Sequence, residues 1–380
     1  MEFTKLGQTG ITVSRACLGG MMFGSWSNAD HDECQAMIRE AHEAGVNFID
    51  TADVYSSGES EEIIGKAIAG SRADWIISTK YSHPMGEGVN RSGASRRWIV
   101  QACEDSMRRL NTDYIDLYIQ HRPDPGTDID ETLGALTDLM RTGKVRAIGS
   151  SNFSAIDMLT ARNVADARGR ERFRCEQLGY SILVRGAERD RLPLAKAQGM
   201  GVMCWSPLAG GWLTGLVRRG APMPTATDIG NFRAVSRYSS EGRFNESKLD
   251  AVEALIALAA DAGLSIVHLG LAFVREHPSV TAPILGPKNE SELRDLLAGS
   301  DVQLSQDVLD RIDAIVPPGY DVHPNDSRSY IPPELQPSGR RRSLASKQPL
   351  YQGLRRAARP TLCSHLATLA SLSERTKERA

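Results

Sequence analysis

Seven short apolar runs of this chain end in polar side chains that could take part in chemistry. They are VNFID (to Asp50), WIISTK (Lys80), YIDLYIQH (His121), VRAIGSSN (Ser151 and Asn152), FRCEQ (Gln177), GVMCWS (Ser206) and APILGPK (Lys288). Tyr55 follows the first run by five residues. A phenol, an ammonium, an imidazole and a carboxylate can donate, hold or stabilise protons. Brought together by the fold, they would form a site for proton transfer.

Four of these residues indicate which group donates a proton and which groups assist it. A tyrosine titrates at about 10 in water, and a nearby ammonium lowers that pKa by favouring the phenolate. Lys80 can supply the ammonium, and Asp50 can keep it charged on burial. His121 can donate a hydrogen bond to the oxygen of a bound carbonyl. Tyr55 is then the predicted proton donor beside a polarised carbonyl.

Each residue taken singly also has an ordinary structural interpretation. Asp50 could belong to capping and turn chemistry before the next helix, Lys80 could be a solvated charge, and His121 could be a satisfied polar group. The functional interpretation depends on convergence, because the four residues come from three neighbouring strands.

The polar residues at the ends of the remaining runs suggest a cofactor site beside the proton donor. Proton transfer is half of a carbonyl reduction, and the hydride must come from a cofactor such as a nicotinamide. Ser151, Asn152 and Gln177 offer hydroxyl and amide groups able to pair with a carboxamide. Trp205 offers a flat face for stacking, although a core aromatic is the alternative interpretation.

The pattern of elements predicts how these residues are positioned. Apolar runs without alternation are typical of buried parallel strands, and segments with helical spacing lie between them. Those segments are HDECQAMIREAHEAG, SEEIIGKAIAG, SRRWIVQACEDSMRRL, DETLGALTDLMRTG, SAIDMLTARNVADA and SKLDAVEALIALAADAG. An open doubly wound sheet is disfavoured, because the first strand, RACLGG, lacks a following GxGxxG turn. We predict an α/β fold, a (β/α)8 TIM barrel with its site at the C-terminal strand ends.

The predicted organisation is an N-terminal β-hairpin and barrel over residues 1–325, then a C-terminal extension over 326–380. The stretch after residue 337 carries ten basic and two acidic residues, and we expect disorder or a loosely docked helix there. The whole chain is nearly neutral, with 45 basic and 47 acidic side chains, so no nucleic-acid partner is expected. No membrane association is expected either, since signal and spanning segments are absent; we expect a cytoplasmic protein with buried thiols.

The motifs DTADVY, ISTK, DLYIQHRPDP, GSSNFS, EQLGYSI, WSPLAGGWLTG and ILGPK, in this order, resemble the aldo-keto reductase superfamily. The likeness spans approximately residues 3–325. It implies that Tyr55 is the general acid and that Asp50, Lys80 and His121 complete the catalytic tetrad. The implied cofactor-binding residues are Gly20, Met21, Asp50, Ser151, Asn152, Gln177, Trp205, Ser206, Pro207, Leu208, Gly210, Gly286, Lys288, Glu292 and Arg294. Trp205 stands where the family normally has tyrosine.

The cofactor implied is NADPH, with NADH as the alternative. Lys288 and Arg294 could pair with a 2′-phosphate. Against this, Glu292 stands where similar sequences often carry glutamine, and an acid there would repel the phosphate. For the carbonyl substrate we expect an apolar pocket that includes Met22, Trp26 and Tyr81.

Two rival functions remain. The segment NRSGASRRWIVQACEDSMRRL is similar to the corresponding part of voltage-gated potassium channel beta subunits, which implies a cofactor-binding partner subunit with little turnover. A metal-dependent hydrolase would need His, Asp or Glu clustered at strand ends, whereas the first strand ends in LGGMM, so no metal is expected. The sequence leaves the physiological substrate, the direction of reaction and the oligomeric state open.

Overall fold

The computed structural model describes residues 1–222, 224–225, 243–324 and 326, without the side chains of residues 243 and 244. The chain divides into two compact units, Met1–Ser329 and Tyr330–Ala380, and only the first contains described residues. The fold below is that of the first unit. Apart from Asp326, the predicted C-terminal extension lies outside the described residues.

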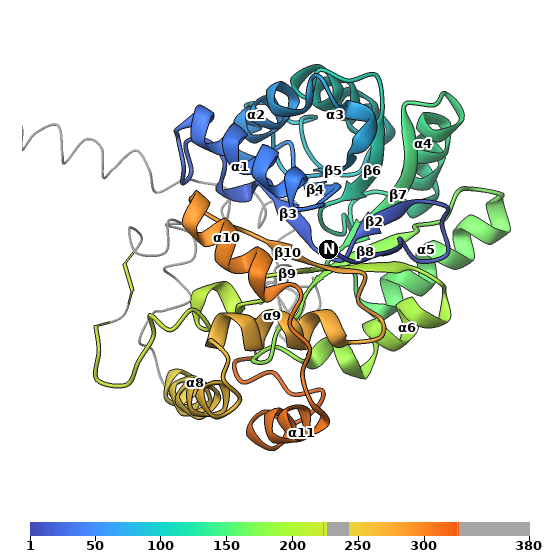
Figure 1. Cartoon of the computed structure of the whole chain (residues 1–380). Helices are drawn as coiled ribbons and strands as arrows, with labels where there is room; N and C mark the ends of the chain where they lie inside the picture. The colour runs from blue at the N-terminus through green and yellow to red at the C-terminus, as the bar shows by residue number, and fades with distance from the viewer. Residues whose placement is uncertain (223, 226–242, 325, 327–380) are drawn as a thin grey trace, which may run out of the picture. The chain divides into compact units, whose positions relative to one another are not determined.

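Eight parallel strands close into a barrel in the order β10-β3-β4-β5-β6-β7-β8-β9, as Figure 1 shows. The strands are β3 (Cys17–Gly19), β4 (Phe48–Asp50), β5 (Ile76–Tyr81), β6 (Ile115–Gln120), β7 (Val145–Ser151), β8 (Cys175–Gly179), β9 (Gly201–Trp205) and β10 (Ala282–Leu285). The first and last strands pair directly, with Cys17 opposite Ile284. The prediction of a (β/α)8 barrel is confirmed.

An antiparallel hairpin precedes the barrel, as predicted. Its strands are β1 (Phe3–Lys5) and β2 (Thr12–Ser14), paired with Phe3 opposite Ser14. Leu6 is buried in the same apolar cluster as Phe48 and Leu117 of the barrel strands. Next to it, the Gln8 backbone N–H donates to the Gly199 carbonyl at 2.8 Å, just before β9 begins. The hairpin therefore closes the N-terminal end of the barrel, opposite the strand ends that carry the predicted site.

Helices alternate with the strands, and all six predicted helical segments are helical. They are α1 (His31–Glu43), α2 (Glu59–Ile68), α3 (Arg96–Arg109), α4 (Ile129–Arg141), α5 (Ala155–Arg168) and α8 (Arg243–Asp261). The sequence prediction omitted α6 (Arg191–Ala197), α9 (Ile266–Glu276), α10 (Glu290–Gly299) and α11 (Gln306–Ile315). Helix α9 is apolar and buried over most of its length, from Ile266 to Arg275.

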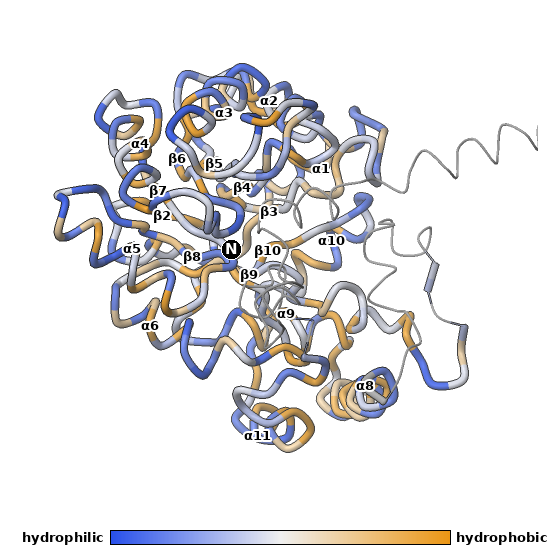
Figure 2. Tube along the Cα trace, turned by 180° about the vertical axis from the view of Figure 1, so that it is seen from behind, coloured by the Kyte–Doolittle hydropathy of each residue, from blue (hydrophilic) through white to orange (hydrophobic). Residues whose placement is uncertain are grey.

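The strand period of two sorts side chains to the inside or the outside of the barrel. On β6, Leu117 and Ile119 belong to the cluster inside the barrel, whereas Tyr118 packs into the layer under the helices. In Figure 2 apolar colouring is concentrated at the strands and the inner helix faces. The five cysteines among the described residues are free and buried, as expected for thiols of the core. Because the strands are covered on both sides, polar residues on them need partners inside the protein.

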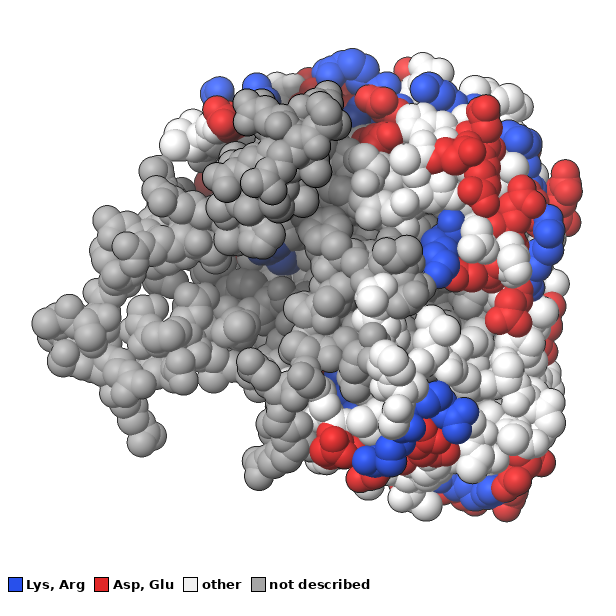
Figure 3. Space-filling model, turned by 90° about the vertical axis from the view of Figure 1, so that its left-hand side faces the viewer, with Lys and Arg blue, Asp and Glu red and all other residues white. Residues whose placement is uncertain are grey.

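The described surface carries both signs of charge. On the face seen in Figure 3, Lys and Arg side chains alternate with Asp and Glu. Pairs such as Arg218 with Glu253, at 2.9 Å, show the local neutralisation. In the part of the chain that the structure describes, no single helix is long and apolar enough to cross a membrane. The pair Asn245–Asp261 and Ile266–Glu276, bent by 93°, meets the criteria of length and composition only when taken together.

The contact of α2 with the end of α3 gives a stability prediction. A Cβ on Gly65 would lie 2.7 Å from the Leu110 carbonyl oxygen, which is backbone and has little freedom to move. We expect Gly65→Ala to lower the free energy of unfolding by about 1–3 kcal/mol, despite the better helix propensity of alanine. The control is Gly70→Ala, because a Cβ there meets nothing within 4 Å. Equal denaturation midpoints for the two variants would contradict this packing.

Candidate active site

Three consecutive strands bring the predicted tetrad together. Asp50 is the last residue of β4, Lys80 lies near the end of β5, and His121 directly follows β6. Tyr55 begins a 3₁₀ turn, Tyr55–Gly58, in the loop after β4. The Tyr55 and His121 rings meet edge to face, with centroids 5.8 Å apart. The structure therefore places all four residues at one site.

The ammonium of Lys80 is the centre of this group. Its Nζ donates to Asp50 Oδ2 at 2.6 Å, to the Thr51 carbonyl at 2.7 Å and to the Tyr55 hydroxyl at 3.3 Å. The lysine side chain is completely buried. Burial lowers the pKa of Lys80, but Asp50 and then Tyr55 outweigh it, and the net pKa is raised. Lys80 is thus a charged donor with all three hydrogen-bonding directions in use.

Tyr55 is held as a neutral phenol at physiological pH. Burial raises its pKa, and this effect exceeds the opposite effect of the Lys80 ammonium, so the net pKa lies above its ordinary value of 10.0. The predicted influence of Lys80 is present, but it does not bring the pKa below that of a free tyrosine. A protonated Tyr55 is the form that a proton donor requires.

His121 is neutral at physiological pH. Burial, reinforced by His83, Lys80 and Arg122, holds its pKa well below the usual 6.5. The His83 ring packs edge to face on it at 4.5 Å between centroids and is itself contacted by the Arg122 guanidinium. A neutral imidazole carries one N–H donor and one acceptor nitrogen. His121 can therefore donate a hydrogen bond without carrying charge into the site.

Asp50 links the tetrad to the opposite side of the barrel. Its Oδ1 accepts from Ser78 Oγ at 2.9 Å and from Gln177 Nε2 at 2.8 Å. Gln177 lies on β8, so this hydrogen bond crosses the inside of the barrel. Both carboxylate oxygens are thus engaged, and the orientation of Asp50 is fixed.

Polar groups at the C-terminal ends of β7 and β9 form a second chain of hydrogen bonds beside the tetrad. Asn152 Nδ2 donates to Ser151 Oγ at 2.8 Å and to the His121 carbonyl at 3.1 Å. Trp205 Nε1 donates to Asn152 Oδ1 at 3.2 Å. Ser151 pairs with Gln177 in the barrel register. The residues expected to contact a carboxamide and an aromatic ring therefore adjoin one another and the tetrad.

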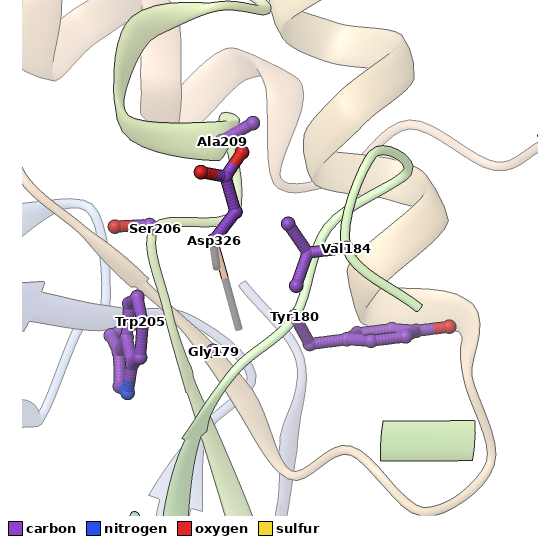
Figure 4. A pocket seen from close by; sticks show the side chains of 7 residues that line it. All are labelled: Gly179, Tyr180, Val184, Trp205, Ser206, Ala209 and Asp326. Atoms are coloured by element: carbon purple, nitrogen blue, oxygen red, sulfur yellow. The ribbon is translucent and has the colours of Figure 1, made fainter. Parts of the chain in front are cut away.

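Trp205 forms one wall of a pocket, shown in Figure 4. A Cβ on Gly179 would lie 2.6 Å from the indole ring, so the backbone of β8 supports the ring directly. The pocket is lined by Gly179, Tyr180, Val184, Trp205, Ser206, Ala209 and Asp326.

Comparison with known proteins agrees with this arrangement. Residues 15–317 match the model of the aldo/keto reductase family. The chain belongs to the aldo/keto reductase family. Its resemblance to that family, first seen in the tetrad motifs, is thereby confirmed, and the region matched contains all eight strands of the barrel.

Several curated relatives align over most of the chain. The uncharacterized oxidoreductase YrpG of Bacillus subtilis is 36% identical over 330 residues, which cover 83% of this chain and 96% of the relative. A probable voltage-gated potassium channel subunit beta of Oryza sativa is 32% identical, with 83% and 97% covered. The versiconal hemiacetal acetate reductase of Aspergillus parasiticus is 31% identical, with 86% and 100% covered.

The cofactor residues implied by the family resemblance occupy two loops. Ser206, Pro207, Leu208 and Gly210 follow β9, where Ser206 (φ 52°) and Gly210 (φ 66°) take left-handed backbone conformations. After β10, Gly286 is open on its surface, since a Cβ there would meet only Met22 Cγ at 3.9 Å. Both loops lie at the C-terminal ends of their strands, on the same side of the barrel as the tetrad.

The charged residues of the second loop are ion-paired within the protein. Glu292 accepts from the Lys288 backbone N–H at 3.0 Å and from its ammonium at 3.1 Å. Arg294 reaches Glu40 on α1 at 2.6 Å and Glu290 at 3.0 Å. Each cation thus already has a carboxylate partner.

The remaining predicted residues fall into three environments. Gly20 is buried, and its carbonyl accepts from Ser60 Oγ at 2.7 Å, which gives it a packing role against α2. Met21 and Met22 are partly exposed in the following turn. The Trp26 ring lies 6.2 Å from the Tyr55 ring. Tyr81, by contrast, is fully buried and packs on Tyr118 under the helices, so we leave it out of the proposed pocket.

Sequence reasoning missed Asp53, a buried carboxyl between Asp50 and Tyr55. In the described part of the chain neither of its oxygens has a hydrogen-bond partner. Burial, then the nearby carboxylate of Glu61, raises its pKa well above 3.8. A sequence signal was lacking, because an aspartate in a loop before a helix ordinarily predicts capping or solvation.

Asp53 makes stability depend on pH in a defined direction. Above about pH 3.8 the unfolded chain ionises Asp53 while the folded protein keeps it protonated, so its contribution to stability falls as pH rises. We expect Asp53→Asn to be more stable than the wild type at pH 7 to 8, by about 1.4 kcal/mol per unit of pKa shift, with the gain vanishing toward pH 4. Denaturant unfolding across this range measures it.

The control is Asp74→Asn, which neutralises an exposed carboxylate. A stability difference independent of pH for both variants would show that Asp53 ionises normally in the folded protein.

Proposed function

We propose that this chain reduces aldehydes or ketones to alcohols, with a hydride from a reduced nicotinamide and a proton from Tyr55. Membership of the aldo/keto reductase family and the oxidoreductases among its relatives support a carbonyl-reducing oxidoreductase. The observation that carries the proposal is the contact between the buried Lys80 ammonium and the Tyr55 hydroxyl, with neutral His121 beside it. We also expect the protein to act in the cytoplasm.

The residues present fit a nicotinamide cofactor. Ser151, Asn152 and Gln177 bring together amide and hydroxyl groups of the kinds that pair with the donors and acceptors of a carboxamide. Trp205 adds an aromatic face supported by Gly179. Bound there, a reduced nicotinamide would supply the hydride that no side chain can provide.

The tetrad handles the proton. Tyr55 donates its hydroxyl proton to the substrate oxygen as that oxygen gains negative charge, and Lys80 stabilises the phenolate left behind. Asp50 keeps Lys80 charged through the 2.6 Å ion pair. His121 orients the substrate oxygen by a hydrogen bond, and its neutrality leaves the proton transfer to Tyr55.

For the substrate we propose a small carbonyl compound with an apolar substituent. Trp26 contacts the Tyr55 ring, and Met22 lies near Gly286 between the ends of β3 and β10. Apolar side chains beside a few convergent polar groups are typical of small-molecule pockets.

The proposed cofactor is NADPH, with a preference limited by Glu292. Lys288 can meet a 2′-phosphate, but its ammonium is held by the Glu292 carboxylate at 3.1 Å. A carboxylate in this position accepts a hydrogen bond from a ribose 2′-hydroxyl and repels a phosphate. NADH is therefore the alternative reductant.

A cofactor-binding partner subunit is the second candidate function. The relative from Oryza sativa with 32% identity is named as a probable potassium channel subunit beta. A protein of that kind would bind the nucleotide with little turnover. Steady-state assays with a panel of aldehydes and ketones distinguish the two, because the reductase oxidises its cofactor in a substrate-dependent manner.

The role of Tyr55 is tested by removing one hydroxyl. We expect Tyr55→Phe to lower kcat by about 10²- to 10⁴-fold, since it deletes the proton donor, while the Kd of NADPH stays nearly constant. Tyr114→Phe is the control, because that tyrosine lies between Arg72 and Arg146, away from the tetrad. Wild-type turnover by Tyr55→Phe would exclude Tyr55 as the acid.

The cofactor preference is tested by a charge exchange in the loop after β10. We expect Lys288→Ala to weaken NADPH by about tenfold more than NADH, because one charge-assisted contact to the phosphate is lost. We expect Glu292→Gln to strengthen NADPH relative to NADH. Fluorescence titration with both nucleotides measures this, and equal effects on the two would place the 2′-phosphate elsewhere.

A further inference from the structure

A second buried ammonium lies outside the tetrad. Lys248 on α8 is 1% exposed, and its Nζ lies 2.5 Å from the Asp326 carboxylate. The same Nζ lies 4.4 Å from the centroid of the Trp212 ring. Burying a lysine is costly unless an anion accompanies it, so the position requires a negative partner.

The surroundings of Lys248 connect it to the loop after β9. Trp212 follows directly on the 3₁₀ turn Ala209–Gly211, at the end of the stretch that begins at Ser206. The family resemblance implies that Ser206, Pro207, Leu208 and Gly210 of that stretch bind the cofactor, and we take them to meet its diphosphate. Lys248 therefore places a positive charge beside the segment expected to meet the most negative part of the cofactor.

The anion that accompanies Lys248 lines the pocket itself. Asp326 lines the pocket together with Trp205, Ser206 and Ala209, and Figure 4 shows its side chain among them. His323 adds a weaker contact, with Nδ1 3.8 Å from the Asp326 carboxylate. A carboxylate in this place repels an incoming diphosphate and competes with it for Lys248.

The segment just before Asp326 is hydrogen-bonded to the loop after β8. The Val322 N–H donates to the Leu183 carbonyl at 3.0 Å, and the Arg185 N–H donates to the Tyr320 carbonyl at 3.1 Å. The Gly186 N–H donates to Asp321 at 2.6 Å. These hydrogen bonds attach the chain after α11 to the loop after β8. Asp326, a few residues further on, therefore lies at the pocket.

We propose that Lys248 is a ligand for the cofactor's diphosphate and that Asp326 holds this ammonium until the nucleotide takes its place. The proposal rests on the proposed function for its ligand, a dinucleotide. It assigns Lys248 and Asp326 opposite effects on affinity: the lysine tightens binding, and the aspartate weakens it by competition.

The test compares Asp326→Asn and Lys248→Gln with the wild type, with ADP and NADPH as probes in calorimetric titrations at two salt concentrations. ADP carries the diphosphate without the nicotinamide. We expect Asp326→Asn to lower the Kd of both probes by about tenfold and Lys248→Gln to raise it by about tenfold with a weaker dependence on salt. In the Lys248→Gln background, the gain from Asp326→Asn should largely disappear.

The control is Asp310→Asn, which removes the same charge from an exposed position on α11 and should leave both affinities unchanged. If Asp326→Asn binds both probes with wild-type affinity, the proposal is wrong. If Lys248→Gln does not fold, the affinity of Asp326→Asn is sufficient to test the proposal. Equal affinity for NADPH in all variants would contradict the competition between Asp326 and the diphosphate, but it would not contradict the proposed function. If no variant binds NADPH, the proposed function fails, and the ADP comparison still supports or overturns the diphosphate site.

Discussion

The site depends on one buried ion pair, between Lys80 and Asp50. An ammonium with no solvent exposure is tolerated because a carboxylate, a backbone carbonyl and a phenol oxygen accept hydrogen bonds from its three N–H groups. Removing one member of such a pair leaves an uncompensated buried charge, which typically costs about 3–5 kcal/mol. Asp50 is in turn fixed by Ser78 and Gln177, so the pair ties strands β4, β5 and β8 together across the barrel. Stability and the proposed chemistry therefore depend on the same atoms.

Strand β5 shows how the barrel serves both purposes. Lys80 points inward to the site, while the neighbouring Thr79 points outward and donates to Glu61 on α2 at 2.5 Å. Glu61 also accepts from Arg109 at the end of α3, at 2.6 Å. The outer network fixes the strand against two helices, and the inner network fixes Lys80, Asp50 and Tyr55 relative to one another. Because both depend on the same backbone, the position of Lys80 is held from two sides.

The sequence was sufficient for the barrel and for the grouping of Asp50, Lys80 and His121, because both follow from local periodicity. Apolar runs of strand length, separated by helices, give parallel strands, and their last residues then meet at one end. The features that the sequence did not reveal depend on contacts between residues far apart in the chain. Arg294, expected at a phosphate, reaches Glu40 across 254 positions of the chain. The Lys248 and Asp326 pair joins elements that carry no shared motif. Tyr81 was assigned to the pocket because it follows Lys80, but the strand period turns it to the opposite side.

The closure of the barrel between its first and last strands has a consequence for how the protein is made. β3 pairs with β10, so Cys17 meets Ile284 only after nearly the whole barrel has been synthesised. Until then β3 and β9 are open sheet edges, with unpaired backbone groups that can associate with other chains. Contacts of such long range also slow folding, because the loop entropy is lost before they form. Nascent chains that stall before β10 would thus be the species most exposed to aggregation, even though the proposed catalytic residues are already present.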